Sequence, residues 1–177
     1  MRTRFWITAI VCLAGLCQAA SSQAGSSQAG SSQTAADQEK ARLEKNKAIV
    51  RGYVDEVVNK GSLAAVDTYF SADAVFNSRP AKAQLALTQA VRQAFPDFRL
   101  TIEDQIAEGD KVVTRVTFSG THNGEFGGIA PTGKRVKYSG IAIDRIVDGK
   151  VVEMWHVAET LSMFQQIGAR LSAEPKK

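Results

Sequence analysis

The sequence predicts an α+β fold, with helices in the first half of the domain and an antiparallel sheet in the second half. Apolar residues recur at three- and four-residue spacing around Val50, Val54 and Val58, which is typical of a helix with one buried face. After Phe98, apolar and polar residues alternate, which is typical of strands that bury one face. A block of helices followed by a block of neighbouring strands is the α+β pattern.

Three helices are predicted before the sheet. The first ends at Lys60-Gly61, where glycine can adopt the left-handed conformation that closes a helix. Ser62 can cap a short second helix. After a brief extended piece at Ala74–Phe76, Pro80 begins a third helix, and Pro96 follows its end.

Four strands and a terminal helix are predicted after the third helix. Asp148-Gly149 is a two-residue hairpin signal between the last two strands, and Leu161, Phe164 and Ile167 form the buried stripe of the terminal helix. The strands are expected at about residues 98–106, 112–119, 135–147 and 151–157. If this sheet curves strongly with the helices on its concave side, it encloses a pocket.

The N-terminus has the pattern of an export signal. Two arginines precede an apolar run from Phe5 to Leu16, and Cys17-Gln18-Ala19 offers small residues to signal peptidase. The apolar run is too short for a membrane span. We therefore predict a signal peptide at residues 1–19 and an exported protein, periplasmic or secreted. Lipoprotein anchoring at Cys17 is the alternative, although Leu16 is large for that cleavage site.

The rest of the chain divides into a linker and one domain. Residues 21–35 repeat the unit SSQAG with one variation, and such small polar residues bury too little apolar surface to offset the entropy of ordering. We predict a flexible linker at residues 20–36, a domain at residues 37–173 and a tail at residues 174–177.

Composition excludes several partners and chemistries. Both cysteines, Cys12 and Cys17, lie in the predicted signal peptide, so the mature chain has no disulfide and no thiol chemistry. Removing the two arginines of that segment leaves 20 basic residues (22 minus 2) against 18 acidic ones, a net charge of +2. We therefore expect no nucleic-acid partner.

Two motifs that suggest phosphate or metal binding lack the required context. The segment Gly128–Lys134 is similar to a phosphate-binding loop, but Arg135 stands where Ser or Thr would hold magnesium, and a strand follows instead of a helix. His122 and His156 lie on separate predicted elements without a close carboxylate. We expect neither a nucleotide nor a metal.

Glu159 is the best-placed candidate for general acid–base catalysis, because it lies where the last strand meets the terminal helix. A carboxyl group at the edge of an apolar cavity has its charged form disfavoured and can exchange protons near neutral pH. The alternative is an acid that interacts with the N-terminal dipole of the helix. His156 is the second candidate, and in a regular strand it points away from Trp155, so only a bulge lets both line one cavity.

Five further side chains are candidates with open alternatives. Arg115 lies mid-strand and is either a charge partner in the cavity or a solvent-exposed residue. Tyr138 and Asp144 share one face of the third strand, as polar groups of the pocket or as ordinary surface. Trp155 is a pocket wall or a core residue, and His122 is a loop residue that reaches the pocket or is solvated.

Several motifs spread over the domain fit one family. They are Asn46–Phe70, Ala94–Phe98, Gly120-Thr121-His122, Gly124-Glu125-Phe126, Pro131–Val136, Asp148–Trp155 and Gln165–Gly168. In these motifs the chain resembles the SnoaL-like polyketide cyclases, also called ester cyclases. The resemblance covers nearly the whole domain and implies a nuclear-transport-factor-2-like fold, in which N-terminal helices and a curved antiparallel sheet form a cone around an apolar pocket.

The resemblance also implies a catalytic carboxylate. In this family an aspartate at the final strand-to-helix junction acts as acid and base in an intramolecular aldol closure, without a metal or an organic cofactor. Glu159, four residues after Trp155, stands at the matching position. The chain departs from the family in three features. The carboxylate belongs to a glutamate, and the chain carries an export signal. The segment between Phe76 and Leu85 is also shortened, and Phe76-Asn77 stands where relatives often have a histidine.

We expect an exported, cofactor-free enzyme that acts on a small, largely apolar carbonyl compound by cyclisation, isomerisation or hydrolysis. Glu159 would move the proton, Arg115 or His156 would assist charge, and Trp155 would form part of the wall. The alternatives are a non-catalytic module of the same fold that binds a small hydrophobic ligand, and a structural protein. In each case an exposed sheet face could form a homodimer.

Overall fold

The computed structural model describes residues 24–170 and divides into two units, residues 1–38 and residues 39–177. The described part of the first unit belongs to helix α1, which runs from Ala24 to Tyr53. Residues from Ala24 onward are thus helical where the sequence predicts a flexible linker, and the alanines and glutamines of the repeat are good helix formers. The predicted signal peptide at residues 1–19 and the tail at residues 174–177 lie outside the described residues.

Short helical segments follow α1 in the second unit. They are the π-helix η1 (Val54–Asn59), the 3₁₀-helix η2 (Leu63–Ala65), α2 (Val66–Tyr69), α3 (Ala81–Ala94) and α4 (Thr160–Ile167). Gly61 has a φ of +72°, so the predicted left-handed end of the first helical segment is confirmed. The predicted start of the third helix at Pro80 is confirmed as well, since Pro80 directly precedes α3.

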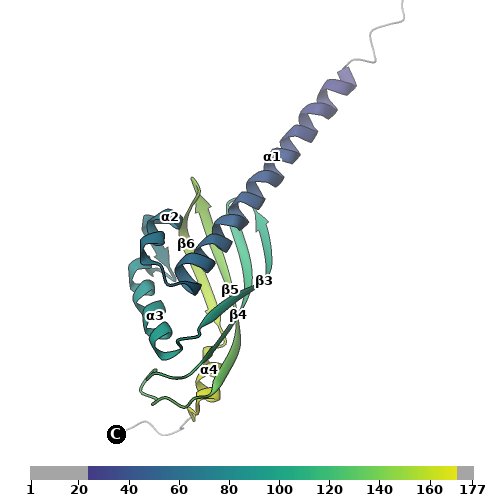
Figure 1. The fold of residues 1–177 in the computed structure, drawn as a ribbon. Helices are drawn as coiled ribbons and strands as arrows, with labels where there is room; N and C mark the ends of the chain where they lie inside the picture. Colours follow the sequence, from purple (N-terminus) through teal and green to yellow (C-terminus); the bar gives the residue numbers. More distant parts are fainter. Residues whose placement is uncertain (1–23, 171–177) are drawn as a thin grey trace, which may run out of the picture. The chain divides into compact units, whose positions relative to one another are not determined.

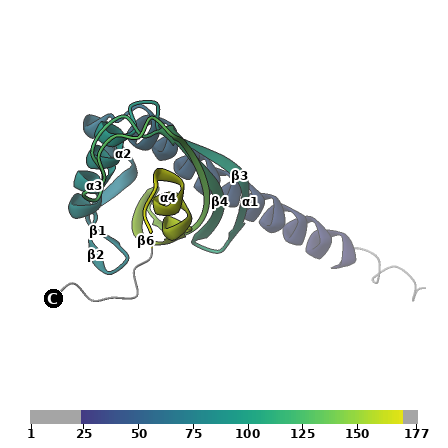
Figure 2. The same cartoon turned by 90° about the horizontal axis from the view of Figure 1, so that it is seen from below.

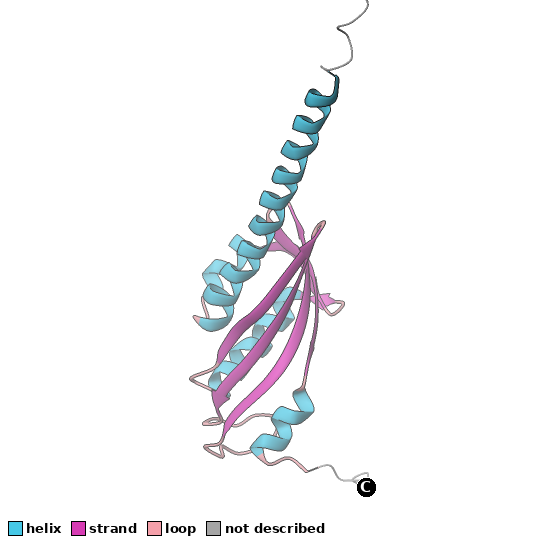
Figure 3. Cartoon of the chain, turned by 90° about the vertical axis from the view of Figure 1, so that its right-hand side faces the viewer, coloured by secondary structure: helices cyan, strands magenta, loops and turns pink. Residues whose placement is uncertain are grey.

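Six strands form a single sheet (Figures 1 and 3). The strands are β1 (Phe70–Phe76), β2 (Arg79–Pro80), β3 (Arg99–Glu108), β4 (Lys111–Thr121), β5 (Arg135–Val147) and β6 (Lys150–Ala158). The predicted antiparallel succession of β3 to β6 is confirmed. The sequence indicates only a brief extended piece in the region of β1, which in the structure pairs in parallel with β6 and extends the sheet to the order β2-β1-β6-β5-β4-β3.

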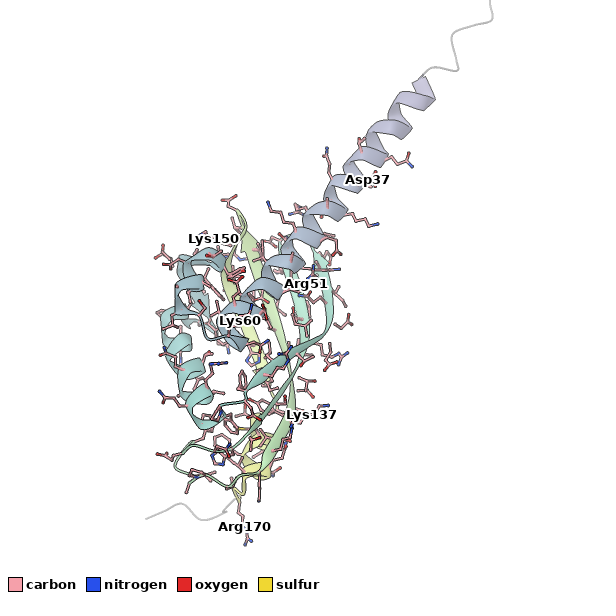
Figure 4. All side chains as sticks on the ribbon, in the orientation of Figure 1. Asp37, Arg51, Lys60, Lys137, Lys150 and Arg170 are labelled. Atoms are coloured by element: carbon pink, nitrogen blue, oxygen red, sulfur yellow. The ribbon has the colours of Figure 1, made fainter. Side chains whose placement is uncertain are left out.

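The sheet is curved, with α2, α3 and α4 on its inner side (Figure 2). The main core lies between this inner face and the end of α1 with η1. It contains Val50, Tyr53, Val54 and Val57 from the helices and Leu100, Val112, Val116, Phe118, Ile146, Val151 and Met154 from the strands. Side chains fill much of the space between the two layers (Figure 4). The α+β class predicted from the sequence is confirmed.

A second, smaller core lies where α3 ends and α4 packs against the start of β5. Its buried members are Ala94, Phe95, Val136, Met163 and Ile167. Met163 and Ile167 share one face of α4, because residues four apart in a helix lie above one another. This packing fixes the junction between β6 and α4, which carries Glu159.

Candidate functional site

A cavity of about 530 Å³ lies between the helices and the inner face of the sheet. Its wall is mostly apolar and comes from nearly every element of the second unit. The apolar lining includes Val54, Val57, Val58, Phe70, Phe76, Val91, Phe98, Leu100, Val116, Phe118, Phe126, Met154, Met163 and Phe164. Polar side chains are few, and those that line the cavity are Tyr53, Asn77, Thr88, Thr114, Tyr138, His156 and Thr160. Such a pocket suits a small ligand that is apolar over most of its surface.

Strand alternation decides which residues reach this cavity. Tyr138 and Ala142 of β5 and His156 and Ala158 of β6 line it, while Ser139, Ile141 and Val157 point to the outer face. The paired register of β5 with β6 places Ala142 opposite His156. The polar groups of the two strands therefore share the inner face with the aromatic side chains of the core.

His156 carries a half-buried imidazole that lies among aromatic rings. Its ring centroid lies 5.9 Å from that of Phe76 and 5.6 Å from that of Phe118. Nε2 is buried and has no hydrogen-bond partner among the described residues. Burial lowers the pKa of His156, so that the neutral imidazole is the favoured form in the cavity wall.

Gly140 on β5 makes room for this imidazole. A Cβ atom at Gly140 would lie 3.0 Å from Nε2 of His156 and 2.9 Å from the Phe118 ring. Both distances are shorter than an ordinary contact, so a larger residue would push these rings away from the strand. The position of His156 thus depends on a glycine on the neighbouring strand.

Asn77 holds the strand segment that carries His156. Its Nδ2 donates to the backbone oxygen of His156 at 3.0 Å, and its Oδ1 accepts from the backbone N–H of His156 at 2.9 Å. Asn77 has a φ of +45°, a left-handed conformation that asparagine tolerates better than most residues. Phe76-Asn77 stands where relatives often have a histidine, and both side chains line the cavity.

Tyr138 lines the cavity with its ring stacked on Phe118. The ring centroids are 4.8 Å apart and the planes differ by 7°. Burial raises the pKa of Tyr138 to about 12, which keeps its hydroxyl protonated.

Asp144 is fully buried two residues beyond Ala142, on the same face of β5. The hydroxyl of Tyr53 lies 3.2 Å from each of its carboxyl oxygens. Burial raises the pKa of Asp144 to about 7, while the hydrogen bond from Tyr53 acts in the opposite direction. Asp144 itself does not line the cavity, but Tyr53 does.

Glu159 lies at the junction that the sequence predicts, as the residue directly before α4. Its side chain is exposed, and its Oε2 accepts a hydrogen bond from the backbone N–H of Ser139 at 3.0 Å. The backbone N–H of Glu159 donates to the backbone oxygen of Ser139 at 2.9 Å. Glu159 is not itself a lining residue, but its neighbours Ala158 and Thr160 are, so it stands at the edge of the cavity.

Arg115 and Trp155 lie on the other face of the sheet. Arg115 is exposed between Thr114 and Val116, which line the cavity, and Trp155 is 37% exposed. The expectation that Arg115 assists charge in the pocket is therefore corrected, because Arg115 alternates with two lining residues of β4 and points to the outer face. The expectation that Trp155 forms the pocket wall is corrected as well. Strand β6 has no bulge between Trp155 and His156 that would let both face inward.

His122 is neither solvated nor a lining residue of the cavity. Its side chain is fully buried, and its ring lies 5.2 Å from that of Phe95. Nδ1 is 3.1 Å from Oγ1 of Thr132, and the backbone of His122 is hydrogen-bonded to Thr132, Gly133 and Lys134. The expectation of a pocket or solvated residue is therefore corrected: His122 joins the loop to the start of β5.

Tyr53 and Phe118 line the cavity, although the sequence patterns did not indicate either as a site residue. Both lie on apolar faces of their elements, so the helical and strand periods give no sign of a pocket. One signal could have indicated a polar pair: the Tyr53 hydroxyl lies on the buried face of a helix, and Asp144 lies on the buried face of a strand. Finding it requires knowing that two residues 91 positions apart meet.

Two absences complete the description of the site. Among the described residues, no three or more His, Cys, Asp or Glu side chains gather in a way that could hold a metal ion. Within residues 24–170, no helix combines the length and the apolar character needed to span a bilayer.

Comparison with known proteins places these features in a family. The sequence profile of the SnoaL-like polyketide cyclases matches residues 48–167. No curated protein matches the chain.

Solved structures with the same fold are similar over most of their length. AclR from Streptomyces galilaeus, described as a candidate hydroxylase, is 32% identical with a TM-score of 0.66 over 76% of this chain and 87% of its own. IdmH from Streptomyces antibioticus, described as a candidate polyketide cyclase, is 28% identical with a TM-score of 0.64 over 70% and 99%. TsrD from Streptomyces laurentii is 26% identical with a TM-score of 0.65 over 72% and 97%.

Proposed function

Because the chain belongs to the SnoaL-like polyketide cyclase family and has a nuclear-transport-factor-2-like fold, we propose that it is an exported enzyme that performs acid–base chemistry on a small, largely apolar carbonyl compound without a cofactor. The reaction would be a cyclisation, an isomerisation or a hydrolysis. The described activities of its structural neighbours differ, so the fold does not select among them. Export rests on the N-terminal pattern of the sequence.

The observation that carries this proposal is His156 in the wall of the apolar cavity. A neutral imidazole can take a proton from a carbon next to a carbonyl group and return it elsewhere, provided that it is near the reacting carbon. Removing this proton leaves an enolate, whose negative charge lies on the carbonyl oxygen. The aromatic rings beside His156 make its surroundings apolar, and in such surroundings the interactions that stabilise the enolate are stronger than in water.

Glu159 is the second acid–base group of the proposal. It stands beside two lining residues at the edge of the cavity, at the position that the family resemblance assigns to the proton-transferring carboxylate. One of its oxygens accepts from Ser139, and a carboxylate has lone pairs left to accept a further proton. In the proposal Glu159 exchanges protons between the ligand and solvent, and His156 acts inside the cavity.

Exchange of the α-protons of 2-tetralone in D₂O, followed by NMR, tests this chemistry without knowledge of the natural substrate. We expect the wild-type protein to accelerate deuteration after treatment with EDTA. Glu159→Gln and His156→Gln should each lower the rate by about 100-fold or more, the range that general acid–base catalysis contributes. The amide of Glu159→Gln still accepts the hydrogen bond from Ser139, so this change removes the proton-accepting group and leaves the contact.

Glu153→Gln is the matched control, because it makes the same chemical change at a carboxylate of β6 that does not line the cavity. It should exchange at the wild-type rate. A wild-type rate in Glu159→Gln would remove Glu159 from the mechanism. Loss of acceleration only after EDTA treatment would remove the cofactor-free assignment.

A non-catalytic binding module is the second candidate function. The exposed position of Glu159 and its two hydrogen bonds to Ser139 favour it, because they give this residue a structural role at the edge of β5. In that case 2-tetralone would bind in the cavity and the wild-type protein would not accelerate its deuteration.

We also propose a homodimer through the outer face of the sheet. Six contiguous exposed apolar residues lie on adjacent strands there: Ile106, Val113, Ile141, Ile143, Trp155 and Val157, which we call the outer patch. The strand register places Ile143 opposite both Val113 and Trp155, and Ile141 opposite Val157, so the patch is continuous. A second copy of the chain offers the same apolar surface, and a two-fold axis would bury both patches at once.

A further inference from the structure

Tyr53 and Asp144 form a buried pair at the cavity that the proposed acid–base chemistry does not use. Tyr53 is the last residue of α1 and lines the cavity with a nearly fully buried side chain. Its ring packs on Phe70 with centroids 5.1 Å apart. Asp144 lies behind it on the inner face of β5, and both of its oxygens are 3.2 Å from the Tyr53 hydroxyl. A hydroxyl has one hydrogen, so it cannot donate fully to both.

We propose that the Tyr53 hydroxyl binds the carbonyl oxygen of the ligand, and that Asp144 is the positioning residue that decides whether this hydroxyl can donate into the cavity. The inference deepens the proposed function and rests on it, because it assigns a place to the oxygen of the carbonyl compound. It also names the chemical class that the pair recognises: a ketone, ester or enol oxygen that accepts one hydrogen bond.

The direction of the hydrogen bond between the pair follows from the protonation of Asp144. An ionised carboxylate only accepts, so the Tyr53 hydrogen then points to Asp144 and the cavity meets an oxygen without a donor. A protonated carboxyl group donates to the Tyr53 oxygen, and the Tyr53 hydrogen is free to bind a ligand. Burial raises the pKa of Asp144 to about 7, so both forms are populated near neutral pH. Burial, followed by the charge and hydrogen bond of Asp144, raises the pKa of Tyr53 well above its usual value and keeps it protonated.

The groups packed around Asp144 offer no counter-charge. The register places Val112 of β4 and Met154 of β6 beside it, and Tyr53 faces it from α1. On its own strand the nearest inward residues are Ala142 and Ile146. Tyr53 is the only titratable group in this set.

Two other polar side chains lie one step further along the inner face. The register places both His156 of β6 and Thr114 of β4 opposite Ala142. His156 is favoured in its neutral form, because burial lowers its pKa. Among the described residues no cation pairs with Asp144. Burying a carboxyl group without a counter-charge costs folding free energy that an apolar residue at this position would not cost. We therefore infer that this carboxyl group has a functional role.

The test uses two fluorescent probes of the same shape. One is 6-propionyl-2-(dimethylamino)naphthalene, which has a ketone oxygen, and the other is 2-(dimethylamino)-6-propylnaphthalene, which lacks it. Dissociation constants of both are measured by fluorescence titration of the full-length protein at about pH 5.5 and about pH 8.5, on either side of the Asp144 pKa of about 7. The ketone preference is the ratio of the two constants at one pH, and it cancels effects shared by both probes.

We expect the wild-type protein to prefer the ketone by about three- to ten-fold at the lower pH, as one neutral hydrogen bond provides. The preference should disappear at the higher pH. Tyr53→Phe, which keeps the ring and its packing, should lack the preference at both pH values. In Asp144→Asn the amide N–H₂ can donate to Tyr53 at any pH, so the preference should stay and become independent of pH.

Tyr69→Phe is the matched control, because it makes the same chemical change at a tyrosine of α2 that does not line the cavity. It should keep the wild-type preference and its pH dependence. Circular dichroism verifies that each variant is folded. The inference is overturned if Tyr53→Phe keeps the preference, if Asp144→Asn keeps the wild-type pH dependence, or if Tyr69→Phe loses the preference. If both probes bind the wild-type protein equally well at both pH values, only this inference fails. If neither binds, the proposed small-molecule function fails with it.

Discussion

At the scale of single residues, Asp144 is a carboxyl group that the fold removes from water. It is fully buried among apolar neighbours, with one hydroxyl as its hydrogen-bond partner. Its charged form is therefore disfavoured, and burial raises the pKa of this carboxyl group from 3.8 to about 7 in the folded protein. This makes the stability of the whole domain sensitive to one carboxyl group.

The unfolding free energy should accordingly fall as the pH rises from about 4 to about 7. In this range the folded state keeps the Asp144 proton that the unfolded chain has already released, so raising the pH favours unfolding. The span from 3.8 to about 7 is about 3 pH units, and at about 1.4 kcal/mol for each unit it corresponds to at most about 4 kcal/mol. Asp144→Asn should lack this dependence. Urea unfolding of both proteins at several pH values measures the difference, and parallel profiles would contradict the assignment of the carboxyl group.

At the scale of elements, the junction of β6 and α4 closes the free edge of β5. Strand β6 pairs with β5 only from Gly140 onward, so residues 135–139 have no strand partner on that side. Glu159 pairs with the backbone of Ser139, and the side chain of Gln166 pairs with the backbone of Lys137 through two hydrogen bonds of 2.9 Å. Two side chains thus continue the ladder where the strand has ended, and they hold α4 beside the cavity.

Gln166→Ala should lower the unfolding free energy by about 1–2 kcal/mol, because two partly exposed backbone hydrogen bonds lose their partner. Gln165→Ala is the matched control: its side chain is exposed and has no hydrogen bond among the described residues, so the change should stay within about 0.5 kcal/mol. Urea unfolding compares the two. Hydrogen exchange at the Lys137 amide should accelerate in Gln166→Ala alone. If both changes lower the unfolding free energy equally, the loss comes from the altered helix and not from the pairing of Gln166 with Lys137.

At the scale of the whole molecule, the two faces of the sheet have different roles in our proposal. The inner face forms the cavity, and the outer patch remains apolar and exposed, with Val157 at 76% and Ile141 at 51% exposure. Apolar side chains gathered on adjacent strands are typical of an interaction surface. The curvature that encloses the cavity also presents this outer surface to a partner.

Sedimentation equilibrium should show a dimer for the wild-type protein and a monomer for Ile143→Lys, since a charge at the centre of the outer patch would be buried without a counter-charge. Val147→Lys is the control, because Val147 is an exposed apolar residue of β5 outside the patch. It should remain dimeric. A wild-type protein that stays monomeric at all concentrations measured would rule out the homodimer.

Local patterns predicted the elements of the second half of the chain well. The two-residue period and the Asp148-Gly149 turn place β5 and β6 close to their observed bounds, because both signals depend on neighbouring residues. The prediction of a flexible linker at residues 20–36 differs from the structure, in which α1 begins at Ala24. Composition alone does not indicate that the helix extends this far toward the N-terminus. Strand β1 was only partly predicted, because its parallel pairing with β6 joins residues far apart in the sequence.

The sequence by itself thus determined the order of helices and strands, the α+β class and the family. It also determined that Trp155 and His156 face opposite sides of the sheet. Only the tertiary structure decided that His156 faces inward, that Glu159 pairs with Ser139, and that Tyr53 meets Asp144. The physical reason is that alternation fixes relative orientation along one strand, whereas the choice of the inner face depends on which helices cover it. Side-chain chemistry at a cavity is decided by contacts between elements, and those contacts have no local period.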